Sequence, residues 1–222
     1  MFLLPDIISR FVEGKESVQV TLSTRTSAQA QRLIANQQFD VGLADYGYGA
    51  AADSRSIDHE VISFEGLCAI PVDDPMAEKD VITAADLNGK PLATLVRSHP
   101  AYASIHAAFD MMEADFDLRF EAIIFIPMFT YIERGLAYAI VDLFSAESYR
   151  LYKKGPHRIV FRPFRPVVNL VATIMSPAHR PVSNVARAFI VGVKDEIYRM
   201  RDSWNQNVSP SSGTTKTSTQ AR

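Results

Sequence analysis

The sequence contains a single cysteine, Cys68, which excludes a disulfide within the chain. Cys68 lies in the apolar run FEGLCAI, which is typical of a buried strand. A free cysteine in such a place is usually a small buried hydrophobe rather than a nucleophile. We therefore expect Cys68 to pack in the core and to carry no catalysis.

Long apolar runs are also missing. No uninterrupted segment approaches the roughly 20 residues that a membrane-spanning helix needs. The N-terminal MFLLP has no basic region, and Asp6 and Arg10 interrupt the apolar residues that follow it, which argues against a signal peptide. We therefore expect a cytoplasmic protein without membrane contact, unless a leader has been removed.

Neither sign of charge dominates, because 23 Lys and Arg residues stand against 25 Asp and Glu residues. A formal net charge of -2 provides no overall electrostatic attraction to nucleic acid. We therefore expect that this chain does not bind DNA by itself.

Sequence motifs of enzymes are absent as well. The chain has no G-x-S-x-G, Walker A, H-E-x-x-H or G-x-G-x-x-G pattern. Its five histidines are scattered; His99 and His106 share one face of a predicted helix, but no cluster of carboxylates or cysteines completes a metal site around them. We therefore predict no catalytic residue, no metal site and no cofactor.

The residues that are present favour an α/β protein. Of 222 residues, 47% are hydrophobic, which suffices for a sizeable core in one or two domains. Val18, Val20 and Leu22 alternate with polar residues, which predicts a strand, and a helix pattern follows them. The short apolar run 41–44 is typical of a buried parallel strand. Residues 18–45 are therefore predicted to form a βαβ unit.

The turn of this unit carries groups that suit an anion. Thr26 and Gln29 have the spacing of a capping box, in which two side chains satisfy free N–H groups at a helix start. The hydroxyl of Ser27 and the guanidinium of Arg25 stand in the same turn, where the helix end carries partial positive charge. Two interpretations stay open, namely ordinary helix capping and a binding site for a carboxylate.

The same pattern returns later in the chain. A short apolar strand at 91–96 precedes Arg97 and Ser98, and a helix is predicted to open after them. A guanidinium at a strand end can hold a carboxylate through two hydrogen bonds, although a plain surface charge is the alternative. Tyr46, in the Gly- and Ala-rich loop after the first unit, either lines a ligand cleft or covers a sheet edge.

The order of the predicted elements indicates two lobes. Residues 1–70 and 164–204 are predicted to form lobe I, residues 71–163 lobe II, and the Ser- and Thr-rich residues 205–222 a disordered polar tail. Each lobe is expected to be an open, mostly parallel sheet with helices on both faces. Ligands of such sheets bind where the carboxyl ends of the strands face a cleft.

Several landmarks occur in the order found in one known family. These landmarks are PDIISRFVEGKESVQVTL, the S/T-rich turn with its helix, QQFDVGLAD, CAIPVDDPM, ITAADLNGKPLATL, IERGLAYAIVD and RIVFRPF. Together they resemble the effector-binding domain of LysR-type transcriptional regulators. The resemblance covers roughly Leu3 to Met200. Within the family, FEAIIFIPMFTYIERGLAYAIVD and RIVFRPF look most like the regulators of opine catabolism.

The resemblance implies an α/β fold of the two-lobed type 2 periplasmic-binding-protein kind, with a small-molecule effector between the lobes. It also implies a homo-oligomer that reaches DNA only through an N-terminal winged helix-turn-helix domain, which this chain does not contain. Carried over position by position, the effector contacts fall on three pairs of residues: Thr26 and Ser27, Arg97 and Ser98, and Ile126 and Pro127.

The chain departs from the family pattern at its start. Lobe I lacks the strand that usually precedes the LLP helix, and this suggests a truncated gene or a fragment. We therefore predict a truncated effector-binding domain whose effector is a carboxylate-bearing metabolite with an amino or guanidino group, such as an opine or an amino-acid derivative. The alternative is a free-standing solute-binding protein of a transporter, which shares the fold.

Overall fold

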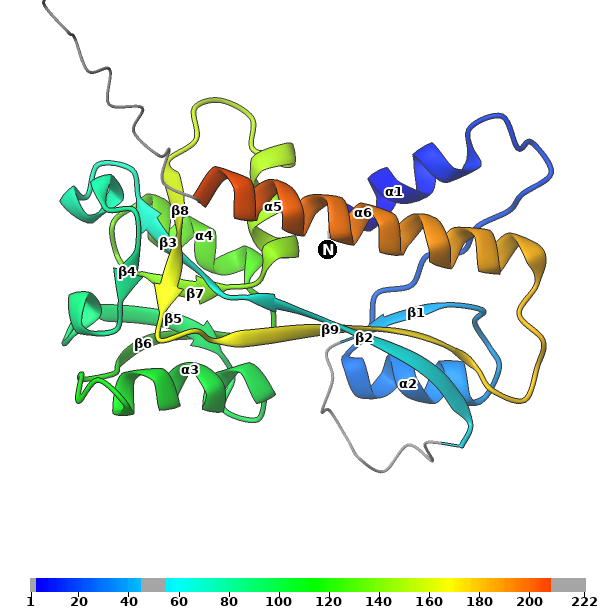
Figure 1. Cartoon of the computed structure of the whole chain (residues 1–222), viewed down its shortest axis with the longest axis horizontal. Helices are drawn as coiled ribbons and strands as arrows, with labels where there is room; N and C mark the ends of the chain where they lie inside the picture. Colours follow the sequence, from blue (N-terminus) through cyan, green and yellow to red (C-terminus); the bar gives the residue numbers. More distant parts are fainter. Residues whose placement is uncertain (1–2, 45–54, 209–222) are drawn as a thin grey trace, which may run out of the picture.

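A computed structural model describes residues 3–44 and 55–208, with side chains as far as Trp204. The described chain forms two α/β lobes side by side along its longest axis, and two long strands pass between them (Figure 1). The cavity described below lies at this junction.

Lobe I is built on a three-stranded antiparallel sheet, so the expectation of a mostly parallel sheet was wrong for this lobe. Its centre is β9 (Asn169–Pro177), which pairs on one side with β1 (Gly42–Ala44) and on the other with β2 (Ile57–Glu65). The helices α1 (Leu3–Val12) and α6 (Asn184–Val208) lie on one side of this sheet, and α2 (Ser27–Ala35) lies on the other (Figure 1).

Lobe II has a mixed sheet in which β8 and β3 are central. The strand order is β4-β8-β3-β7, and a parallel bridge between Leu92 and Tyr138 joins β7 to the parallel pair β5-β6. The strands of lobe II are β3 (Leu67–Pro71), β4 (Ile82–Thr83), β5 (Pro91–Leu95), β6 (Asp117–Ala122), β7 (Ala139–Val141) and β8 (Ile159–Arg165). Its helices are α3 (Pro100–Asp110), α4 (Phe129–Glu133) and α5 (Leu143–Tyr152), with the 3₁₀ turns η1 (Pro75–Glu78), η2 (Ala85–Leu87) and η3 (Ile126–Met128).

The two crossings between the lobes touch each other at Gly66. Its N–H donates to the carbonyl of Val168 at 2.8 Å, and a Cβ added there would approach Cγ2 of Ile140 to 2.9 Å. It would also approach the carbonyl oxygen of Val168 to 3.3 Å, so a side chain at this position would displace Ile140 and crowd the second crossing. The strands change sheet at 66 and between 165 and 169, a few residues from the predicted lobe limits at 70 and 164.

The last helix, α6, contacts both lobes. Near its end, the indole N–H of Trp204 donates to Glu147 on α5 at 3.1 Å, and the indole ring meets Phe161 of β8 edge to face. The helix continues to Val208, beyond the predicted start of a disordered tail at 205; residues 209–222 lie outside the described part.

The prediction of a strand at 18–22 was wrong. These residues have no regular secondary structure, and the side chains of Val20 and Leu22 are 48% and 47% exposed. Alternating apolar residues form a strand only when a neighbour completes the hydrogen-bond ladder, and the described sheet of lobe I ends at β1. The predicted parallel pairing of 41–44 was also wrong, because among the described strands β1 pairs with β9 alone and runs antiparallel to it.

Local predictions based on caps and buried runs were confirmed. Thr26 and Gln29 form the predicted capping box at the start of α2. Cys68 lies in β3 with no exposed surface, and this burial raises the pKa of its thiol far above the ordinary value. A thiol held in this protonated form is a poor nucleophile, in agreement with a packing role.

Candidate functional site

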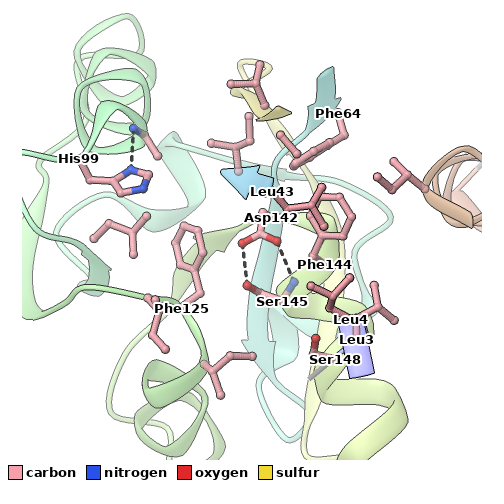
Figure 2. A pocket seen from close by; sticks show the side chains of 18 of the residues that line it. Leu3, Leu4, Leu43, Phe64, His99, Phe125, Asp142, Phe144, Ser145 and Ser148 are labelled. Atoms are coloured by element: carbon pink, nitrogen blue, oxygen red, sulfur yellow. Dashed lines mark hydrogen bonds between the residues drawn. The ribbon is translucent and has the colours of Figure 1, made fainter. Parts of the chain in front are cut away.

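A cavity of about 370 Å³ lies where the two lobes meet. Lobe I contributes side chains from α1, β1, β2, β9 and α6, and lobe II contributes the start of α3, the loop before η3 and the first half of α5. His99 and Phe125 lie on one side of the cavity, and Phe64 and Phe144 lie on the other (Figure 2). A ligand in this space would touch both lobes at once.

The lining is mostly apolar. Its polar and titratable side chains are His99, Ser104, Asp142, Ser145, Ser148 and Asn169. All other lining residues are apolar, and no lysine or arginine is among those that the structure describes at this cavity. An acidic ligand therefore has to be held here by N–H and O–H groups, unless a cation moves in from outside the cavity.

The one carboxylate among the described lining residues already accepts hydrogen bonds. Asp142 is the N-cap of α5: one oxygen accepts the N–H of Ser145 at 2.8 Å, and the other accepts its hydroxyl at 2.6 Å (Figure 2). Asp142 thereby satisfies free donors at the helix start, which is the usual role of such a residue. It also uses the proton of the Ser145 hydroxyl, which is then no longer available as a donor to a ligand.

The start of α3 forms another part of the wall. Nδ1 of His99 accepts the N–H of Ala101 at 3.1 Å and so caps the start of α3 (Figure 2). Pro100 occupies the first turn, where its missing N–H is tolerated. The first turn of α3 therefore brings partial positive charge to the cavity without a cationic side chain.

The sequence profile of the LysR substrate binding domain matches residues 2–197. The chain belongs to this family. Regulatory protein NocR of Agrobacterium tumefaciens (strain T37) is 25% identical over 192 residues, which cover 86% of this chain and 61% of NocR. The chain thus spans about three fifths of the length of this relative.

Two solved structures share the fold. HinK, a LysR family transcriptional regulator from Pseudomonas aeruginosa, superposes with a TM-score of 0.67 at 14% identity, over 87% of this chain and 65% of HinK. The CcmR regulatory domain of Synechocystis PCC6803, solved in complex with 2-PG, gives 0.67 at 12% identity, over 90% of this chain and 91% of that domain. The two-lobed, periplasmic-binding-protein-like fold expected from the sequence is thereby confirmed.

Membership of the LysR family also bears on the predicted class of function. Domains of this family are parts of transcriptional regulators rather than enzymes, in agreement with the prediction. The matched relatives give no support to the alternative of a transporter's solute-binding protein.

Within the described residues, no three His, Cys, Asp or Glu side chains gather as they would around a metal ion. None of the described helices is long and apolar enough to cross a membrane.

The structure places the residues predicted in lobe II close to the cavity but not all in its wall. Ile126 lines the cavity, and Pro127 beside it is exposed. Arg97 and Ser98 directly precede the lining residue His99, and both are exposed. The guanidinium of Arg97 lies 6.0 Å from the centre of the Tyr102 ring.

The residues predicted in lobe I surround the start of α2. The hydroxyl of Thr26 accepts the N–H of Gln29 at 3.3 Å, Ser27 begins the helix, and the guanidinium of Arg25 donates to the carbonyl of Thr24 at 2.7 Å. None of them lines the cavity, although Leu43 of the adjoining strand β1 does. Tyr46 lies outside the described residues.

Sequence reasoning missed most of the lining. Asp142 had a usable signal, since it directly follows the buried strand YAIV and precedes a helix. The apolar members had none: Leu3, Phe64 and Val193 follow periodicities that predict core positions, and each is buried. A residue that packs in a core and one that lines an apolar cavity have the same sequence pattern.

A carboxylate on α6 links this helix to α1, and the two helices form one wall of the cavity. Glu196 on α6 accepts from Arg10 on α1 at 3.1 Å and pairs with Arg199. Partial burial opposes ionisation of Glu196, but the hydrogen bonds from Arg10 and Arg199 outweigh it and lower the pKa of this carboxyl below its ordinary value. Phe11 and Phe189 pack edge to face in the same interface.

We expect Glu196→Gln to reduce the free energy of unfolding by up to about 1 kcal/mol at neutral pH. A carboxyl whose pKa is lower in the folded state stabilises the fold above its unfolded pKa of about 4.3, and loses that effect as the pH falls through the folded value. Urea unfolding at neutral and at acidic pH should therefore show a difference from the parent chain that shrinks in acid. Glu13→Gln, at an exposed position just after α1, is the control, and a difference that grows in acid would contradict the prediction.

Proposed function

We propose that this chain is the part of a LysR-type regulator that binds a small carboxylate-bearing metabolite, such as an opine or an amino-acid derivative, between its lobes. The observation that carries this proposal is the cavity walled by both lobes, with the first turn of an 11-residue helix, α3, at its edge. A helix start of this kind favours an anionic group through its partial positive charge.

The proposed contacts include the three pairs of residues named from the sequence. Ile126 already lines the cavity, with Pro127 beside it, and Arg97 with Ser98 adjoins the α3 start. We propose that these groups close on the effector from lobe II. From lobe I we propose Thr26 and Ser27, with a weaker role for Arg25 and Tyr46.

The proposed mechanism is a change in the angle between the lobes. An effector that touches both lobes stabilises the arrangement in which it makes more contacts, and it shifts the equilibrium by no more than that difference in affinity. We propose that the complete protein works in the cytoplasm as a homo-oligomer and passes this shift to an N-terminal DNA-binding domain. The CcmR regulatory domain, which shares the fold, was solved with the small molecule 2-PG.

Titration calorimetry with a panel of opines and N-acylated amino acids tests the proposal. We expect at least one of these acids to bind with a stoichiometry near one per chain. The same acid should raise the midpoint of thermal unfolding, because a ligand that binds only the folded state stabilises it. The matching amides, which lack the carboxylate, are the control; equal binding of acid and amide would contradict the proposed anion site.

A further inference from the structure

The walls of the cavity indicate which acids fit it. We propose that the cavity selects acids whose side chain is apolar, such as N-acylated phenylalanine or leucine, over acids that carry a guanidinium or ammonium group. This inference rests on the proposed function, because it takes the carboxylate as given and concerns the rest of the effector.

The wall of lobe II carries an unbroken apolar run. Residues Ile123, Ile124, Phe125 and Ile126 all line the cavity, and the first two are 69% and 53% exposed. Covering these two exposed isoleucines with an apolar group of the ligand would make the free energy of binding more favourable, by roughly 25 cal/mol for each Å² of apolar surface removed from water. Leu95 of β5 continues the same wall toward the interior.

The opposite wall is apolar as well. Leu43 of β1, Phe64 of β2 and Phe144 of α5 face the cavity from the other side (Figure 2). Phe64 and Phe144 meet edge to face with their ring centres 5.2 Å apart, and a third aromatic or branched aliphatic group in the cavity would pack favourably against such rings. An apolar side chain in the cavity would therefore be covered on two sides.

A cation in the same place would meet one counter-charge among the described lining residues. Asp142 is the only carboxylate among the described lining residues, and both of its oxygens accept hydrogen bonds from Ser145. A guanidinium or ammonium group would leave water for a wall of isoleucine and phenylalanine, and pairing with Asp142 would first have to offset the cost of desolvating the cation. The helix start of α3 adds partial positive charge, which repels a cation further.

One matched pair of probes compares the binding of an acid with an apolar side chain and an acid with a cationic one. N-acetyl-L-phenylalanine and N-acetyl-L-arginine share the acyl group and the carboxylate, and they differ only in the side chain. We expect calorimetry on the whole chain to show tighter binding of the phenylalanine derivative by about tenfold or more, since apolar pockets discriminate by factors of this size.

A pair of variants links this preference to the cavity. Ile124→Asp places a carboxylate on the lobe II wall, and it should reduce the preference for the phenylalanine derivative by about tenfold. Leu151→Asp makes the same chemical change at a residue that is also 53% exposed but lies outside the cavity lining, and it should leave both affinities unchanged. Both positions are open enough for the chain to keep its fold.

Each outcome decides the inference. Equal binding of the two probes, or tighter binding of the arginine derivative, overturns the apolar selection and leaves the carboxylate site standing. An effect of Leu151→Asp as large as that of Ile124→Asp removes the assignment to this wall. If neither probe binds at millimolar concentration, the proposed carboxylate site itself fails, and the inference about side chains fails with it.

Discussion

Replacing Arg97 with alanine is expected to weaken binding of a carboxylate effector by about tenfold or more without unfolding the chain. A hydrogen bond to a charged group contributes roughly 1.5–3 kcal/mol, which corresponds to at least a tenfold change in affinity. Arg97 is exposed and directly precedes the lining residues at the α3 start, and its guanidinium lies over Tyr102. Binding requires this guanidinium to turn from the ring toward the cavity.

Calorimetry with the acid that binds the parent chain measures this effect. Arg134→Ala removes another exposed guanidinium, just after α4 and outside the cavity lining, and should leave the affinity unchanged. If Arg97→Ala binds as tightly as the parent, the role of this guanidinium is discarded. The partial positive charge at the start of α3 and the hydroxyls of Ser104 and Ser148 in the lining would then be the remaining anchor for the carboxylate.

The largest expected loss of stability is at Phe109. Its side chain is fully buried, meets Phe116 edge to face at 5.1 Å between ring centres, and stacks near Phe164 at 5.9 Å. Truncating such a ring to alanine removes apolar burial and leaves a cavity, at a cost of about 3–5 kcal/mol. This is a large share of the roughly 5–15 kcal/mol that holds a typical domain folded.

Urea unfolding of Phe109→Ala, followed by circular dichroism, should therefore show a much lower midpoint. Met112→Ala, two residues beyond α3, is the matched control, because its side chain is 44% exposed and a change there is expected to cost less than about 0.5 kcal/mol. Equal midpoints for the two variants would show that the aromatic cluster contributes little to the fold.

Several features of the fold were predictable from a few neighbouring residues. The capping box of Thr26 and Gln29, the buried strand around Cys68 and the helix start after Ser98 all have the predicted form. In each case the physical cause is local, since caps act over three residues and strand or helix periodicity over about ten. The family landmarks added the order of the lobes, because they occur along almost the whole chain.

For segment 18–22, the local sequence pattern did not predict the structure. Its alternation of apolar and polar residues is that of a strand, yet it forms no ladder with the described residues of lobe I. Strand pairing depends on which backbone lies alongside, and the pattern within one segment carries no information about that. The antiparallel pairing of β1 with β9, where a parallel strand was predicted, has the same origin.

By itself, the sequence determined the α/β class, the two lobes, the family and the caps of individual helices, because these depend on periodicity and on spacing along the chain. Only the tertiary structure decided that Leu43, Phe64, Ile124 and Phe144 meet around one cavity and that Asp142 is engaged by Ser145. Those residues lie far apart in sequence, and the apolar ones have the pattern of ordinary core positions. Whether an apolar side chain faces another element or an open space depends on how the lobes pack, and that is a property of the whole fold.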